Sequence, residues 1–553
     1  MKLENKTLNL KQISIERLGF ATLASLTIIP FYVTLFHFLF TSLIGGDVDS
    51  YLLVYTALFI GGFCSYLFYF FGEKNILNRL LAVCILSIIL SIGIRVDFIS
   101  RVTLAFILIS VGIITTFLIN KIVKELPQDI DGLSKIYKIR TFLFILLSIL
   151  TITLVSRLSV FMNNFQYVEA SVLPGIPFFK THSCLTAYAH ATYLIENGVL
   201  NLYDTINWSH EANSLYTPFI LDAFMYPPPF LLLPKFLFSM TNSFMVMRGI
   251  WFGFSGIFII CVFWKIAKWT SAKNEWHSIF LIFLVGSSLS VLVTLQTGNI
   301  HHVTIAMAIL AMFLFEKNKP ILGGALLAFA IASKISPGLL CIVLLVRQRW
   351  RDLIWTSVFG VIYLILSILI FGTKPMQDFL FYEIPLLRSG EAMYWLDKQT
   401  NEILINVSPF GIPFKLKLLG IILDNPWQVA KVIGNIYTVV IVIVTIYFSR
   451  FDKNPRQQAS LWLGVLTLAG FQSPFAPGYV GIPLLWGITI IAADYKSRTG
   501  IFLLAVGWIL LTVLIPVPPF SEFVGALFSL FQQLIAFIAV WILLKPKASQ
   551  IIS

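Results

Sequence analysis

Apolar runs of about 17 to 25 residues, separated by short polar breaks, recur along most of this 553-residue chain. A helix needs about 20 consecutive apolar residues to cross a hydrocarbon core of about 30 Å. Only 12% of the residues are charged, 58% are hydrophobic, and the mean hydropathy is +0.88. Soluble domains carry about twice that charged fraction. The pattern therefore predicts an all-α polytopic membrane protein and excludes a soluble globular domain.

The apolar runs predict about 16 transmembrane helices. They are placed at residues 18–42, 51–72, 79–96, 100–120, 141–160, 244–265, 276–295, 301–315, 320–333, 338–346, 353–372, 429–449, 458–470, 481–493, 499–516 and 522–543.

The basic residues indicate the orientation. Most of the 39 Lys and Arg residues fall in segments that are cytoplasmic if the N-terminus is cytoplasmic. We therefore expect both termini in the cytoplasm and the two long polar loops, residues 161–243 and 373–428, on the outer side. The same bias explains the net charge of +13, so we expect membrane lipids as surroundings and no nucleic-acid partner.

The five cysteines show no disulfide or metal-binding spacing, and no Gly-rich nucleotide loop is present. We therefore expect no metal and no cofactor.

A long polar cytoplasmic stretch, residues 120–140, suggests the domain organisation. It separates an N-terminal accessory unit of four spans, residues 1–140, from a catalytic unit, residues 141–500. Residues 501–553 form the C-terminal spans.

The first outer loop is expected to carry two interfacial helices. Residues 185–194 are apolar with His and Tyr and end at Gly198, which is typical of an amphipathic helix with a glycine stop. Residues 230–240 follow a triple proline and are too short to span the membrane.

An ordered series of short motifs runs through the middle of the chain. It consists of Leu202-Tyr203-Asp204, Tyr226-Pro227-Pro228, Gln296-Thr297-Gly298-Asn299, Ala332-Ser333-Lys334-Ile335-Ser336-Pro337 and Gln472-Ser473-Pro474. Together with its membrane sides, the series resembles glycosyltransferase family 87, of the GT-C class, over about residues 141–500. The resemblance implies a hexosyltransferase that moves a mannose-like sugar from a polyprenyl-phosphate donor to a hydroxyl of a lipid or glycan acceptor at the outer face.

Such chemistry needs a cation beside the departing phosphate and a base for the acceptor proton. Lys334 is the candidate cation, because it ends an apolar run where an ammonium group is costly without an anionic partner. The alternative is a lysine that only reaches toward the lipid headgroups. Arg388 and Arg157 are the fallback cations.

The residues leave two candidates for the base. The resemblance implies an Asp early in the first outer loop, yet no Asp stands between Asp131 and Asp204. The corresponding place falls near His182, whose ordinary pKa of about 6.5 suits a base. Glu169 is the nearest upstream carboxylate. Both are catalytic candidates, and both fit equally well as solvated loop residues.

Other polar and aromatic residues on the outer side are candidates for substrate binding. Aromatic rings can stack on the apolar face of a sugar while amide and basic groups bind its hydroxyls or phosphate. The alternative is that these residues only solvate the loops. The candidates are Gln296, Asn299, His301, Arg388, Trp395, Tyr188 and Tyr226.

Two other functions stay open. An inactive binding homologue is possible because the expected Asp is missing. A lipid or small-molecule transporter would place charges inside the spans and repeat its broken helices, and neither pattern is found. We expect a multi-pass protein of the bacterial inner membrane.

The orientation can be tested by labelling a cysteine introduced in the first outer loop, Ser214→Cys. An impermeant maleimide should label this variant in intact cells, and the parent protein serves as the background control. Protection until the membrane is permeabilised would overturn the predicted topology.

Overall fold

The computed structural model describes residues 15–126 except 74, 138–271 except 200, 209–214 and 242, 277–492 except 394 and 452–453, and 507–545 except 510 and 513–519. Within these ranges the regular secondary structure is helical, with turns and loops between the helices, and no strand forms. One isolated bridge joins His182 to Ile220. The prediction of an all-α polytopic membrane protein is confirmed.

The predicted count of 16 spans is wrong. The described residues contain nine helices that are long and apolar enough to cross a membrane, or up to ten if one sharply bent pair counts as a single span. These nine coincide with predicted spans near residues 18–42, 51–72, 79–96, 100–120, 141–160, 244–265, 353–372, 429–449 and 522–543.

The remaining predicted spans fail because apolar composition does not distinguish lipid contact from burial inside the protein. The run at 320–333 forms a helix of 14 residues, which is about 21 Å long and cannot cross a core of about 30 Å. The run at 276–295 breaks into two short helices. Most of the predicted span 499–516 lies outside the described residues, as does Ser214.

The chain divides into two compact units. The first contains Met1–Ala170 with Phe252–Ile257 and Ala272–Phe283. Its helices are α1 (Ile15–Ile44), α2 (Ser50–Phe71), α3 (Ile76–Gly93), α4 (Phe98–Glu125) and α5 (Lys138–Asn163).

Small residues and hydroxyls hold the first unit together. A Cβ on Gly112 of α4 would stand 2.0 Å from the Val83 side chain of α3, so the glycine permits close helix packing. The hydroxyls of Thr34 and Ser159 are 2.8 Å apart and join α1 to α5. Hydrogen bonds of this kind satisfy polar groups that lipid cannot solvate.

The second unit contains Ser171–Trp251, Phe258–Ser271 and Leu284–Ser553. Its earlier helices are α6 (Pro177–Thr181), α7 (Leu185–Glu196), α8 (Leu232–Met240), α9 (Phe244–Thr270, shared with the first unit), α10 (His277–Gly286, also shared), α11 (Leu289–Thr297), α12 (His301–Glu316) and α13 (Pro320–Ser333). Its later helices are α14 (Leu339–Val346), α15 (Trp350–Phe371), α16 (Lys374–Asp378), α17 (Ile384–Ser389), α18 (Thr400–Ile405), α19 (Ile412–Leu418), α20 (Pro426–Ser449), α21 (Pro455–Gly470), α22 (Ile482–Ala492) and α24 (Glu522–Leu544).

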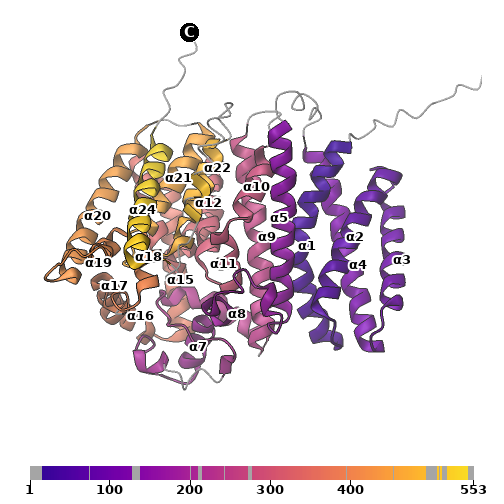
Figure 1. Cartoon of the computed structure of the whole chain (residues 1–553), viewed down its shortest axis with the longest axis horizontal. Helices are drawn as coiled ribbons and strands as arrows, with labels where there is room; N and C mark the ends of the chain where they lie inside the picture. Colours follow the sequence, from indigo (N-terminus) through magenta and orange to yellow (C-terminus); the bar gives the residue numbers. More distant parts are fainter. Residues whose placement is uncertain are drawn as a thin grey trace, which may run out of the picture. The chain divides into compact units, whose positions relative to one another are not determined.

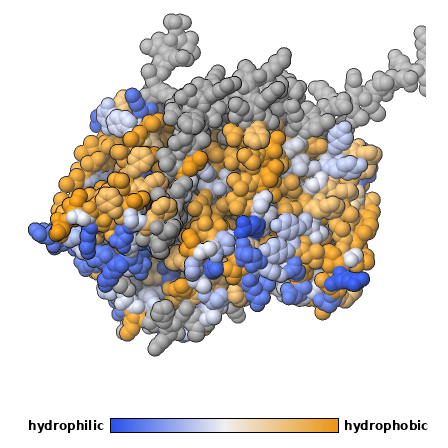
Figure 2. Space-filling view, in the orientation of Figure 1, coloured by the Kyte–Doolittle hydropathy of each residue, from blue (hydrophilic) through white to orange (hydrophobic). Residues whose placement is uncertain are grey.

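The loop helices of the second unit gather together. Figure 1 shows α7, α8 and α16 at the same end of the long helices of this unit, so the two predicted outer loops emerge on one side. Figure 2 shows hydrophobic side chains over the flank of α20 and hydrophilic ones below it, over the loop helices.

The expected helix at 185–194 exists but is not interfacial. In α7, every residue from Leu185 to Thr192 is buried, whereas Tyr193 is exposed. The helix therefore lies inside the polar end of the unit, where its small Ala and Thr residues allow packing on several sides. This corrects the prediction that it lies in the membrane surface with one face in lipid.

A glycine pair fixes the position of α13. A Cβ on Gly324 would stand 2.7 Å from the backbone of Trp355 in α15, and one on Gly323 would stand 2.5 Å from the Phe315 ring of α12. Helix α13 is therefore held closely between α12 and α15. This packing fixes the position of Lys334, the residue that follows its last turn.

One carboxyl group of the second outer loop is deeply buried. Glu383 ends the π-helical segment Phe379–Glu383 and is 4% exposed. Its Oε1 atom has no hydrogen-bond partner among the described residues. Burial raises the pKa of this carboxyl from 4.5 to about 7. In the folded protein it therefore holds its proton over a pH range in which the unfolded chain has lost it.

We predict that Glu383 makes the protein less stable as pH rises from about 4.5 to 7, because the folded state binds more protons than the unfolded state in that range. Glu383→Gln should raise the melting temperature in detergent at pH 8 and change it little at pH 5.

The matched control is Glu391→Gln, a neighbouring exposed carboxylate that pairs with Lys431 at 3.4 Å. It should shift the melting temperature by less than Glu383→Gln does at pH 8. An equal effect of Glu383→Gln at both pH values would contradict the prediction.

Candidate functional site

A sharp turn between α11 and α12 forms the centre of the site. Helix α11 ends at Gly298 in the left-handed conformation, with φ of +71°, and the two helix axes differ by 112°. A Cβ at Gly298 would lie 2.5 Å from the Leu185 side chain. The turn therefore requires glycine both for its backbone angle and for its contact with α7.

Asn299 ties this turn to the start of α7. Its Oδ1 accepts a hydrogen bond from the backbone N–H of His301 at 2.9 Å, and its Nδ2 donates to the Cys184 sulfur at 3.3 Å. The backbone N–H of Cys184 in turn donates to the carbonyl of Thr297 at 2.8 Å. The turn and the N-terminal end of α7 are thus joined in both directions.

Lys334 directly follows α13, and its backbone N–H still donates to the carbonyl of Ala330. Its Nζ atom lies 3.5 Å from Nδ1 of His301 and 5.8 Å from the centre of the Tyr226 ring. The side chain is half-buried. The ammonium group thus lies beside an imidazole of the turn and the face of an aromatic ring of the first outer loop.

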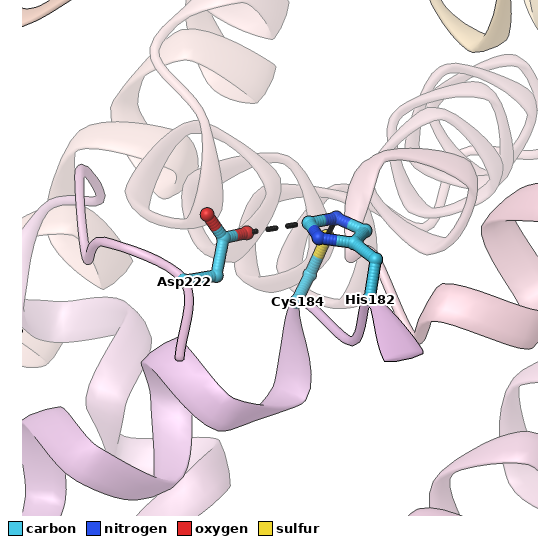
Figure 3. A group of neighbouring side chains, drawn as sticks. All are labelled: His182, Cys184 and Asp222. Atoms are coloured by element: carbon cyan, nitrogen blue, oxygen red, sulfur yellow. Dashed lines mark hydrogen bonds and ion pairs between the residues drawn. The ribbon is translucent and has the colours of Figure 1, made fainter. Parts of the chain in front are cut away.

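His182, Cys184 and Asp222 form a compact cluster next to the turn. In Figure 3 the three side chains point toward one another. The Cys184 sulfur lies 3.5 Å from Nε2 of His182, and Oδ2 of Asp222 lies 3.9 Å from the same nitrogen. The side chains of His182 and Asp222 are 18% and 36% exposed, so the cluster is partly open on the carboxylate side.

Two backbone segments hold this cluster in place. The hydroxyl of Thr186 accepts a hydrogen bond from the backbone N–H of Asp222 at 3.0 Å and donates to the carbonyl of Ser183 at 2.7 Å. The backbone N–H of Ile220 donates to the carbonyl of Thr181 at 2.8 Å. Asp222 is therefore fixed opposite His182 although 40 residues separate the two in the chain.

Burial favours the uncharged forms of His182 and Cys184. It lowers the pKa of His182, an effect that the nearby Asp222 carboxylate only partly offsets. Burial also raises the pKa of the Cys184 thiol, and Asp222 adds to the rise. At neutral pH, the imidazole and the thiol are therefore neutral in the absence of any added cation.

Lys334 and the turn at Asn299 are linked to the cluster of His182, Cys184 and Asp222 by one continuous series of polar contacts. It runs from Lys334 to His301, through Asn299 to Cys184, and on to His182 and Asp222, with separations between 2.9 and 3.9 Å. The structure therefore joins the predicted cation to one of the two predicted bases.

Two predicted substrate-binding residues use their polar atoms within the protein. Gln296 accepts a hydrogen bond from the backbone N–H of Val172 at 2.7 Å and donates to the carbonyl of Phe179 at 2.6 Å. The Tyr188 hydroxyl donates to that of Tyr226 at 3.3 Å and accepts from the N–H of Ile300 at 3.1 Å. Both residues brace the first outer loop against the turn.

Glu169 belongs to the first unit. Its carboxylate accepts a hydrogen bond from Tyr51 at 3.1 Å, and its backbone carbonyl accepts one from Arg157 at 2.6 Å. These contacts bring two sequence candidates, Glu169 and Arg157, together in that unit.

The candidates of the second outer loop lie in different surroundings. Trp395 packs edge-on against Phe475 at 4.7 Å and belongs to an apolar cluster with Phe410 and Trp427. Arg388 is exposed at the end of α17 and has no hydrogen bond or ion pair with another described residue. Trp395 is thus a packing residue in this structure, and Arg388 is open to solvent.

Sequence reasoning overlooked Asp222 and Cys184 as members of the site. Asp222 lies far along the loop from the place where the resemblance implies a base, so the sequence gives no local reason to select it. Cys184 has no neighbouring cysteine or histidine at a spacing that is typical of a disulfide or a metal site. The signal available in the sequence was that the loop contains few acids and that Asp222 stands just before the Tyr226 motif.

A surface cavity lies at the other end of α13 and does not involve these residues. It is lined by Asn318, Pro320, Gln348, Arg349, Trp350, Arg351 and Asp352. Arg349 is already paired with Glu316 at 3.0 Å and Asp352 at 2.6 Å. The guanidinium group of Arg349 is therefore used to join helix ends. Among the described residues that line it, the cavity offers no pair of a free cation and a base that sugar transfer would require.

Residues 224–474 match the model of glycosyltransferase family 87. The matched segment includes Tyr226, Asn299, His301 and Lys334 and begins two residues after Asp222. The matched segment is shorter at both ends than the range of about residues 141–500 over which the motifs resemble this family. No curated protein and no solved structure matches the chain.

Proposed function

We propose that this chain, a membrane glycosyltransferase that carries a glycosyltransferase family 87 domain, takes a hexose from a polyprenyl-phosphate donor and transfers it to a hydroxyl of a lipid or glycan acceptor. The observation that supports this proposal is the continuous series of contacts from Lys334 to Asp222. A cation and a carboxylate at the two ends of one cluster are the groups that this reaction requires.

Lys334 supplies the positive charge for the leaving phosphate. When the bond between the sugar C1 and the phosphate oxygen breaks, negative charge grows on that oxygen, and an ammonium group beside it lowers the barrier. Asn299 and His301 hold the turn that faces the lysine. The half-buried position strengthens the interaction because less water screens it.

Asp222 accepts the proton of the acceptor hydroxyl. As the hydroxyl oxygen bonds to the sugar C1, its proton passes to the carboxylate, and the phosphate leaves with the bonding electrons. The Asp222 side chain is 36% exposed, so an acceptor can approach it. Glu169 is less suited to this role, because its carboxylate is hydrogen-bonded to Tyr51 in the first unit.

We place the reaction at the outer face of the membrane. Both segments that supply the cluster, residues 181–184 and 220–222, belong to the loop that the distribution of Lys and Arg assigns to that side. A lipid-linked donor suits this side, because nucleotide sugars are made in the cytoplasm and the chain shows no Gly-rich nucleotide loop.

The donor class can be tested with the purified protein in lipid vesicles. We expect transfer from a polyprenyl-phosphate hexose and none from the corresponding nucleotide sugar when the enzyme that makes the lipid donor is absent. Direct turnover of the nucleotide sugar would overturn the proposal.

The role of Lys334 can be tested by substitution. A charge-assisted contact is worth about 1.5–3 kcal/mol, so Lys334→Ala should reduce transfer roughly ten- to a hundredfold. Lys334→Arg should keep part of the activity because the charge remains while the geometry changes. Initial rates with saturating acceptor provide the measurement.

Lys319→Ala is the matched control, because this exposed lysine caps the other end of the same helix. It should transfer sugar at the normal rate. If Lys334→Ala also did so, the lysine would only extend toward the headgroups, and the phosphate contact would have to be sought at Arg388 or Arg157.

A further inference from the structure

We propose that His182, Cys184 and Asp222 bind a divalent transition-metal ion of the Zn²⁺ class. One ligand atom from each residue, namely Nε2, Sγ and a carboxylate oxygen, lies within 4.8 Å of the other two. The three residues come from segments that the first outer loop folds against each other (Figure 3).

The separations fit ligands that share one ion. Zn²⁺ binds a thiolate sulfur at about 2.3 Å and an imidazole nitrogen at about 2.0 Å, so a tetrahedral site places these atoms about 3.5 Å apart. The sulfur of Cys184 and Nε2 of His182 are 3.5 Å apart. The 3.9 Å between Nε2 and Oδ2 of Asp222 is slightly wider, and a small rotation of a half-exposed carboxylate shortens it.

Hydrogen bonding explains the same arrangement less well. The Cys184 thiol can donate its one proton to Asp222, but the carboxylate oxygen at 3.9 Å is too far to accept a hydrogen bond from Nε2 of His182, although both groups lie around that nitrogen. A catalytic relay would instead place the carboxylate on Nδ1, so that the imidazole stands between the acid and the thiol. A cation resolves this geometry, since all three atoms can direct a lone pair at it.

The ligand types select the metal. A sulfur and an imidazole nitrogen favour Zn²⁺ and related ions, whereas Mg²⁺ and Ca²⁺ prefer oxygen ligands. The surroundings suit a bound thiolate, because the amide of Asn299 donates to the Cys184 sulfur and Lys334 adds positive charge nearby. Partners of this kind orient metal ligands and tune their basicity.

Three protein ligands leave one position of a tetrahedral ion open, as in sites that bind water or a substrate oxygen. In the proposed reaction, that open position would receive an oxygen of the acceptor or donor. This role of the open position rests on the proposed function, whereas the metal site itself does not. Nε2 of His182 would then be occupied, and the proton would pass to the second oxygen of Asp222.

The test is metal content and Co²⁺ spectroscopy on the full-length protein in detergent. We expect a stoichiometric amount of Zn²⁺ by mass spectrometry after growth in defined medium. Replacement by Co²⁺ should give a near-ultraviolet band from sulfur to metal together with the visible bands of a tetrahedral ion. Cys184→Ser should lose the sulfur band, whereas Cys341→Ser, in α14, should keep it.

Asp222→Asn provides a second variant in case Cys184→Ser does not fold, since its side chain is partly exposed. It should weaken Co²⁺ binding at least tenfold, with an unchanged gel-filtration profile. Absence of stoichiometric metal from the wild-type protein, or a sulfur band that survives in folded Cys184→Ser, would overturn the metal site. Lys334→Ala should keep the sulfur-to-metal band of bound Co²⁺ even if it binds the ion less tightly, so loss of the metal site and failure of the proposed transfer reaction are separate results.

Discussion

The sharp turn at Gly298 is the constraint on which the site depends. An apolar stretch that could have formed one span is instead two helices, whose axes differ by 112°. The turn presses against Leu185 so closely that a Cβ would lie 2.5 Å away. Asn299 and the carbonyl of Thr297 can therefore bind Cys184 at the start of α7. The turn therefore joins the first outer loop to the interior of the second unit.

Lys334 reaches the same place for a separate reason. The glycine pair of α13 allows that helix to lie between α12 and α15, and the helix ends after 14 residues, well short of a full crossing. Its last residue is followed by a lysine whose ammonium group meets His301 at 3.5 Å. A short helix thus ends in a lysine that is half-buried within the second unit, where an ammonium group is costly without a polar or anionic partner.

The composition and length of the apolar runs predicted the class of the protein and the nine long helices, because a bilayer imposes a minimum length on any helix that crosses it. The excess spans arose because the interior of this second unit is as apolar as lipid. Helix α21 is buried at every position from Ala459 to Gly470, and its composition resembles that of a span. Hydropathy alone cannot tell whether lipid or protein covers such a helix.

The sequence by itself determined the membrane class and the motifs that match the family 87 model, and it led to the hypothesis that Lys334 is the cation, since each depends on residue types at short spacing. Only the tertiary structure shows that Asp222 lies beside His182. Asp222 meets His182 because the Thr186 hydroxyl and the contact between residues 181 and 220 fold one loop back on itself. The roles of Gln296 and Tyr188 as braces also depend on backbone groups more than 100 residues away. Contacts over such distances leave no local pattern, because the chain between them can adopt many paths.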